Sequence, residues 1–259
     1  MAEWNDNQTR QGFGTAPGQA GDVQSRTSFD AGLRKHMLSI YNYMASGVLL
    51  TGLVAMLLAR AGMVSGAVLM IGSLGSLGIV FAMSFGRDRF STGTLQAMFW
   101  AYAVLMGMAI SYIFIVYTGP SIAMTFFAAA GAFAGLSLWG YTTQKDISGW
   151  GSFLIMGVIG LILASLLNIG WAFFTGAPIS GLDLAISALG VLVFAGLTAY
   201  DTQRLKHEYL AISQMKMTNP AVAEAYPMGK LVIMGALTLY LDFINMFLFL
   251  LRFMGAARE

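Results

Sequence analysis

The 259-residue chain has no cysteine, only two histidines and few charged residues. The absence of cysteine excludes disulfides, thiolate metal sites and cysteine nucleophiles. The two histidines, His36 and His207, have no metal-ligand spacing to other residues. Charged residues make up 10% of the chain, whereas soluble domains carry about 25%. This scarcity excludes an ordinary soluble domain, and we expect neither a bound cofactor nor a nucleic-acid partner.

Apolar residues account for 57% of the chain and gather in long runs. A hydrocarbon core of about 30 Å requires about 20 residues of helix. Seven segments meet this requirement, near 36–60, 63–85, 95–118, 120–142, 150–173, 182–204 and 230–254. The sequence therefore predicts an all-α membrane protein, with a bundle of seven transmembrane helices over residues 31–259 embedded in the lipid bilayer.

Two segments between or before the apolar runs are expected to be irregular. Residues 1–30 are polar and lack the apolar stretch of a signal peptide, so we expect a disordered tail. Residues 205–229 are expected to form a long loop, because Asn219-Pro220 and Pro227 interrupt it before the last helix. Within the fourth predicted helix, Gly131 and Gly135 form a GxxxG pattern, which is typical of close helix packing in lipid.

The basic residues predict an orientation, because cytoplasmic loops of membrane proteins carry an excess of lysine and arginine. With the N-terminus in the cytosol, eleven of the 14 basic residues fall on the inner side and three on the outer side. The inner set is Arg10, Arg26, Arg34, Lys35, Arg87, Arg89, Lys145, Arg204, Lys206, Lys216 and Lys230, and the outer set is Arg60, Arg252 and Arg258. We therefore expect a multi-pass protein of the inner (plasma) membrane with a cytosolic N-terminus.

Asp242 lies in the middle of the last apolar run, residues 231–251, which has no other charge. A carboxylate at that depth costs about 2.5–3.5 kcal/mol on insertion scales. Ionisable residues inside a membrane are rare and mark ion or proton pathways. Asp242 is therefore the first candidate functional residue.

A short internal repeat singles out a second acid, Asp201. The fourth predicted helix ends in Phe-Ala-Gly-Leu and then Tyr-Thr-Thr-Gln-Lys145, and the sixth in Phe-Ala-Gly-Leu and then Tyr-Asp-Thr-Gln-Arg204. In the alignment on Tyr-x-Thr-Gln, Thr142 stands in the place of Asp201. The helix end therefore does not require a carboxylate, which favours a functional role for Asp201.

If Asp201 and Asp242 meet, two carboxylates in a medium of low dielectric cannot easily both ionise and would share a proton. When deprotonated, the same oxygens suit a hard divalent cation such as calcium. The pair is therefore a candidate pH sensor, gate and transient calcium site. Contact requires the sixth helix to lie deeper than its predicted bounds, or the last helix to be shifted inward.

Structural roles are alternatives for both acids. Asp201 could form a local ion pair with Arg204 three residues further on or with Lys206, and Asp242 could take part in a hydrogen bond inside the bundle. The candidate partners of Asp242 are Tyr200, Asn245 and Asn168. Tyr200, Asn245 and Arg204 are accordingly candidate supporting residues. Asp183, at the outer end of the sixth helix, is expected to be solvated and favoured by the helix dipole.

Three segments resemble the Bax inhibitor-1 (TMBIM) family: FAGLTAYDTQRLK, LYLDFINMFLFLLRF and MSFGRDRFST, the last resembling bacterial members. The resemblance covers roughly residues 30–255. It implies a seven-helix bundle in which the last helix is central and is wrapped by three hairpins. It also implies a pH-sensitive calcium leak gated around a di-aspartyl site, here Asp201 and Asp242. The arginine of the second helix that pairs with the first aspartate corresponds to Arg89, with Arg87 as the alternative.

Two other functions are alternatives to a calcium leak. The chain could regulate or bind a membrane-embedded protease through its tail and the 205–229 loop. It could also be an intramembrane aspartyl protease, because such enzymes place two aspartates on adjacent helices, the first in a Tyr-Asp dipeptide. Those proteases need Gly-x-Gly-Asp at the second position, whereas Leu239-Tyr240-Leu241 precedes Asp242. We therefore expect that the chain is not an enzyme.

Overall fold

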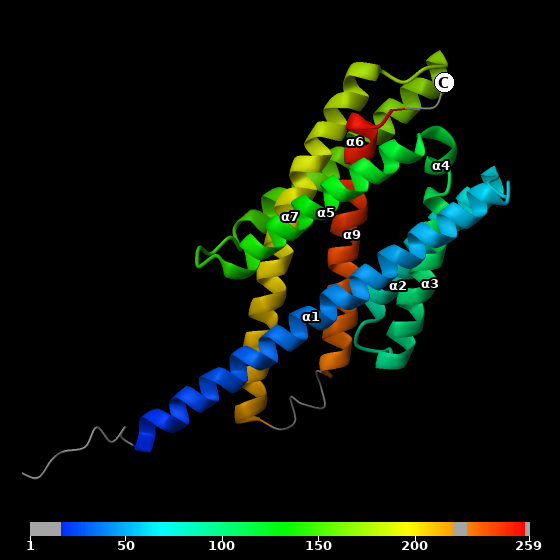
Figure 1. Ribbon diagram of the computed structural model, residues 1–259. Helices are drawn as coiled ribbons and strands as arrows, with labels where there is room; N and C mark the ends of the chain where they lie inside the picture. Colours follow the sequence, from blue (N-terminus) through cyan, green and yellow to red (C-terminus); the bar gives the residue numbers. More distant parts are fainter. Residues whose placement is uncertain (1–16, 220–226, 257–259) are drawn as a thin grey trace, which may run out of the picture.

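The computed structural model describes residues 17–219 and 227–256, and every regular element in these ranges is a helix (Figure 1). The helices are α1 (Pro17–Arg60), α2 (Gly66–Gly86), α3 (Thr92–Ile110), α4 (Ile113–Val116), α5 (Gly119–Thr142), α6 (Trp150–Thr175), α7 (Ser180–Thr218) and α9 (Met228–Met254). Seven helical segments are long and apolar enough to cross a membrane, with α3 and α4 together forming one of them. The predicted all-α, seven-span architecture is confirmed.

Short turns separate most of the spans, so that neighbours along the chain run antiparallel. Hydroxyl side chains start several helices: Ser65 accepts a hydrogen bond from the backbone N–H of Val68, and Ser91 from that of Thr94. Such capping satisfies one of the free N–H groups at a helix start. The turn after α6 closes at Gly176, whose φ of 81° only glycine adopts readily.

The first helix begins earlier than the sequence indicates. α1 starts at Pro17, ahead of the expected start of the first span near residue 36. Proline suits the first position of a helix, because its fixed φ is helical and its missing N–H is not needed there. The remainder of the predicted tail, residues 1–16, lies outside the described residues.

The most important difference concerns α7, which continues to Thr218 instead of ending near residue 204. The predicted loop over 205–229 is therefore wrong for its first half. Leu205 and Ile212 are buried on one face of the extension, which supports its helical structure. The helix stops at Asn219, because the residue before a proline disfavours helical backbone.

Helix α9 is the most buried span. Of its most apolar 18-residue window 67% is buried, compared with 39% or less for every other candidate span. α9 packs against α1, α3, α5 and α7, and Figure 1 shows it running between these helices. Tyr240 at its middle is fully buried and shares a hydrogen bond of 2.6 Å with Thr51 of α1, whose hydroxyl also donates to the carbonyl of Ala103 in α3. These hydrogen bonds connect α1, α3 and α9 near the middle of α9.

Candidate functional site

Asp242 points into the packed interior from the middle of α9. Asp242 is only 4% exposed, and its neighbours in the sequence, Tyr240 and Phe243, are also buried. Asp242 lies about 21 Å from the start of α9 at 1.5 Å per residue. The sequence-based placement of this acid deep inside the bundle is therefore what the structure shows.

Asp201 reaches the same depth because α7 is long. It is 5% exposed, and about 25 Å of helix separates it from the end of α7 at Thr218. The carboxyl groups of Asp201 and Asp242 are close enough that each affects the ionisation of the other. Two carboxyl groups can hydrogen-bond only when one of them carries a proton. A hydrogen bond between the two acids therefore requires a shared proton, and the difference in depth suggested by the predicted bounds of the sixth helix disappears.

The counter-ion of Asp201 is Arg204, one turn further along α7. Arg204 Nη2 lies 2.9 Å from Asp201 Oδ1, and the arginine side chain is 49% exposed while that of Asp201 is 8% exposed. The guanidinium also lies 5.8 Å from the ring centre of Tyr200. With one shared proton, the two carboxyl groups carry one negative charge, which Arg204 balances. Asp201 thus forms the local ion pair with Arg204, expected above as a structural alternative, and at the same time lies close to Asp242.

The predicted counter-ions Arg89 and Arg87 do not reach Asp201 in the structure. Arg87 Nη2 pairs with Glu208 Oε1 at 2.8 Å. Within the described ranges, Arg89 is exposed and forms no ion pair. The reason is the extension of α7, because the loop after α2 meets Glu208, which lies about 10 Å beyond Asp201 along the helix. Sequence reasoning missed Glu208, since it was placed in a loop.

The other expected partners of Asp242 have different contacts. Asn245 donates to the carbonyl of Leu241 at 2.8 Å, and Asn168 accepts from the backbone N–H of Ile179 at 2.8 Å. Tyr200 packs beside Gly151 of α6, where a side chain would collide with its hydroxyl. Among the residues that the structure describes, Asp242 Oδ2 is buried and has no hydrogen-bond donor.

A series of hydrogen-bonded hydroxyl groups next to Asp201 links three helices. Tyr41 of α1 shares a hydrogen bond of 2.7 Å with Ser137 of α5, which shares one of 2.9 Å with Thr202 of α7. Thr202 donates in turn to the carbonyl of Thr198. Thr202 directly follows Asp201 in the sequence. The hydrogen-bonded hydroxyl groups therefore fix the turn of α7 that carries Asp201. The repeat Tyr-x-Thr-Gln was the only sequence signal for it.

Gln203, the last residue of that repeat, holds the loop between α5 and α6. Its Oε1 accepts from the backbone N–H of Ile147 at 3.0 Å, and its Nε2 donates to the carbonyl of Lys145 at 2.8 Å. In the same loop, the backbone N–H of Ser148 donates to Asp146 and keeps the pKa of this carboxyl below its ordinary value. Gln203, from the Tyr-x-Thr-Gln repeat in α7, thus fixes the loop that follows the matching repeat at the end of α5.

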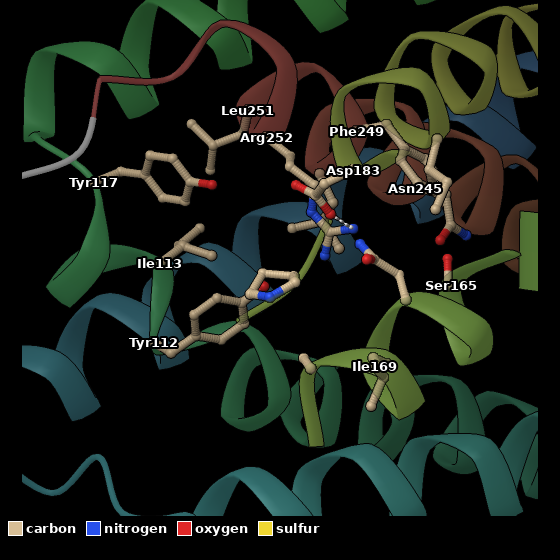
Figure 2. A pocket seen from close by; sticks show the side chains of 15 residues that line it. Tyr112, Ile113, Tyr117, Ser165, Ile169, Asp183, Asn245, Phe249, Leu251 and Arg252 are labelled. Carbon is tan, nitrogen blue, oxygen red and sulfur yellow. Dashed lines mark ion pairs between the residues drawn. The ribbon is translucent and has the colours of Figure 1, made fainter. Parts of the chain in front are cut away.

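A cavity of about 470 Å³ lies at the end of the bundle opposite to Arg204 (Figure 2). Asp183 and Arg252 face each other across it, with 3.6 Å between Asp183 Oδ1 and Arg252 Nη1. Asp183 stands in the first turn of α7, where an acid is favoured by the helix dipole, as expected. Figure 2 shows Tyr112 and Tyr117 on one side of this ion pair and Asn245 on the other.

Metal-binding capacity near the two buried acids is limited. In the described part of the chain, no group of three or more His, Cys, Asp and Glu side chains is close enough to hold a metal ion. In proteins, calcium usually binds about six to eight oxygen ligands. Two carboxylates alone therefore suit a transient contact with the ion rather than a permanent site.

Comparisons with known proteins agree on one relationship. The family model described as "Inhibitor of apoptosis-promoting Bax1" matches residues 33–259. A protein of Rickettsia prowazekii is 44% identical over 242 residues, which cover 90% of this chain and 94% of the relative. The inner membrane protein YbhL of Escherichia coli is 42% identical over 234 residues, covering 88% of this chain and 94% of YbhL. A protein of Caulobacter vibrioides is 41% identical over 246 residues, covering 90% and 92%.

Proposed function

The chain belongs to the Bax inhibitor-1 family, and on this premise we propose that it is a proton-regulated calcium leak, gated around Asp201 and Asp242. The observation that carries the proposal is the close approach of two carboxyl groups that are both buried inside the bundle. Buried acids of this kind mark ion and proton pathways in membrane proteins. The protein is then a passive conductor rather than an enzyme.

Charge balance explains how protons would regulate such a site. With one shared proton, the negative charge of the pair is balanced by Arg204, whose Nη2 lies 2.9 Å from Asp201. Loss of that proton leaves an unbalanced negative charge in a medium of low dielectric, which is costly unless a cation compensates it. Protons and calcium therefore compete for the same oxygens.

The same oxygens determine what kind of cation site this is. Asp242 Oδ2 is buried and has no hydrogen-bond donor in the described residues, so it is free to face a cation. A hard divalent cation prefers such carboxylate oxygens. Because conduction requires a site from which the ion can leave, a pair with few further ligands suits a leak better than a storage site.

We further propose that the protein lies in the inner membrane with its N-terminus in the cytosol. The Escherichia coli relative is named an inner membrane protein. Of the 14 basic residues, Arg60, Arg252 and Arg258 alone would then face outward. The end that carries Arg34, Arg87 and Arg204 would face the cytosol.

The first prediction concerns calcium flux into liposomes that contain the purified protein. Wild-type flux, measured from about pH 5 to 8, changes with pH because the carboxyl pair gains or loses its shared proton. Asp201→Asn and Asp242→Asn each remove one ionisable group, so this pH dependence disappears in both. Asp88→Asn is the matched control, because Asp88 is exposed and lies in the loop after α2.

The control variant should keep the wild-type profile. Unchanged flux and unchanged pH dependence in both Asp201→Asn and Asp242→Asn would contradict the proposal.

A regulatory role toward a membrane-embedded protease is the second candidate. The 39 residues of α7 measure about 58 Å, roughly 28 Å more than the hydrocarbon core. Met215 and Met217 are exposed on the part that extends beyond it. Replacing both with serine should leave calcium flux intact but abolish co-purification of such a protease. Loss of flux with intact co-purification would speak against this role.

A further inference from the structure

A continuous apolar groove runs along the outside of the bundle between α1 and α5. It consists of three cavities of about 480, 570 and 270 Å³. The first two share Met44, Ala45 and Phe133, and the second and third share Val48, Gly52, Phe114 and Phe126. Helices α1 and α5 both pack on α9, which supplies Phe243 to the floor. The groove is therefore open to the side of the bundle and closed by α9 behind.

The length of the groove matches the thickness of a membrane. Its α1 wall extends from Arg34 to Met56, a distance of about 33 Å along the helix. The hydrocarbon core of a bilayer measures about 30 Å. Because α1 and α5 are membrane-spanning segments by length and composition, the groove faces lipid along its whole length.

Small side chains create this groove. Ala45 and Gly52 of α1 face Ala130 and Ala134 of α5, and the walls between them are leucine, methionine and phenylalanine. A Cβ at Gly52 would meet no atom within 4 Å. Empty apolar space costs dispersion contacts unless something fills it. In a bilayer, the available apolar filling is an acyl chain.

The two ends of the groove differ in charge. Arg34 lines one end, together with Tyr141, and Lys206 Nζ lies 5.4 Å from the ring centre of Tyr141. None of the residues that line the three cavities is acidic. Within the described ranges, the guanidinium of Arg34 forms neither an ion pair nor a side-chain hydrogen bond. This end therefore carries positive charge available to a phosphate.

We propose that the groove between α1 and α5 is a binding site for an anionic glycerophospholipid. Its acyl chain lies between Ala45 and Ala134, and its phosphate lies at Arg34, with Lys206 nearby. Arginine matches phosphate geometry through two parallel N–H donors. Basic residues at the membrane surface favour anionic over neutral lipids.

The bound chain also covers the wall of the carboxyl pair. Phe133, which lines the groove, packs edge-to-face on Phe243 with 5.7 Å between the ring centres. Phe243 follows Asp242 in α9. An acyl chain in the groove therefore contacts the aromatic pair that lies next to Asp242 along α9.

Native mass spectrometry of the full-length protein in detergent tests the site with phosphatidylglycerol and phosphatidylcholine of identical acyl chains. Wild type retains phosphatidylglycerol preferentially. Arg34→Gln reduces this preference about fivefold, since a basic residue near the surface contributes about 1 kcal/mol toward anionic lipid. Arg89→Gln is the matched control, an exposed arginine outside the groove.

A second pair of variants tests the apolar part. Ala134→Phe fills the groove and abolishes retention of both lipids, whereas Ala132→Phe, on the exposed side of the same helix, retains them. Thermal unfolding without added lipid checks that all variants fold. Wild-type preference in Arg34→Gln, or wild-type retention in folded Ala134→Phe, overturns the proposal. The measurement uses no calcium, so its outcome is separate from that of the flux experiment.

Discussion

At the scale of single residues, Arg204 decides how the two buried acids can be charged. It is bound to Asp201 at 2.9 Å and yet is half exposed, so it links a buried carboxylate to the aqueous side of the bundle. A partner this close on the same helix moves with the acid. The charge of the site therefore depends on the proton far more than on any motion between helices.

Arg204→Gln should shift the pH dependence of calcium flux toward higher pH. Without the guanidinium, the ionised form of the pair is less favourable, and the shared proton is retained to higher pH. We expect this shift to be modest, because the half-exposed arginine is screened by water. Flux into liposomes over the pH range measures it.

Arg89→Gln provides the comparison for this experiment and should leave the profile unchanged. An Arg204→Gln profile identical to that of wild type would show that the ion pair has no influence on the gate.

The two acids could be predicted from the sequence, whereas their counter-ion could not. Asp242 was evident because it is the only charge in its apolar run, and Asp201 because its repeat partner is Thr142. The choice between Arg89 and Arg204 depends on how far α7 continues beyond Asp201. The spacing of three residues along one helix also indicated Arg204 as a partner of Asp201. Only the packed structure shows which of the two arginines pairs with Asp201.

At the scale of helices, glycine positions show which faces touch. Gly140 of α5 lies against the backbone of Ala199 in α7, and an added Cβ would overlap it. By contrast, Cβ atoms at Gly131 and Gly135 would meet nothing within 4 Å. The GxxxG pattern predicted as a packing face therefore points away from the rest of the chain, and the close approach occurs one turn later.

Gly140→Ala should destabilise the protein by about 1–3 kcal/mol, because it forces α5 away from α7. Gly135→Ala has the same chemistry on an open face and should change stability by no more than about 0.5 kcal/mol, or raise it slightly through helix propensity. Thermal or denaturant unfolding in detergent compares the two. Equal effects would contradict the contact between Gly140 and Ala199.

The glutamines of the two repeat copies provide another matched pair. Gln203→Ala removes both hydrogen bonds to the 143–149 loop and should cost about 1–3 kcal/mol, because it leaves buried backbone groups unpaired. Gln144, its counterpart, is exposed. Gln144→Ala should therefore be close to neutral in the same unfolding measurement. Faster proteolysis of the 143–149 loop in Gln203→Ala alone would support the same conclusion.

Helix number was predictable and helix length was not. Hydropathy identifies the membrane-spanning part of a helix, since it reports apolar residues alone. The extension of α7 is polar on one side, and its helical structure depends on Leu205 and Ile212 packing against neighbouring helices. Such tertiary contacts are not visible in a hydropathy pattern.

At the scale of the whole molecule, the absence of cysteine allows the orientation to be measured directly. Gln144→Cys lies in the exposed loop before α6, and Ala177→Cys in the exposed turn after it. With a cytosolic N-terminus, a membrane-impermeant maleimide labels Ala177→Cys from outside intact spheroplasts and labels Gln144→Cys only after lysis. The reverse pattern would overturn the proposed orientation.

Helix α7 carries an ion-pairing residue on each side of the acid of the buried pair. Asp183, near the start of α7, faces Arg252, and Glu208, about 37 Å further along the helix, binds Arg87. Because a continuous helix rotates about its axis as one rigid body, a rotation at one point moves every residue along it. A change of charge at Asp201 that turns α7 would therefore loosen or tighten both outer ion pairs at the same moment, so that the two mouths of a pathway would not move independently.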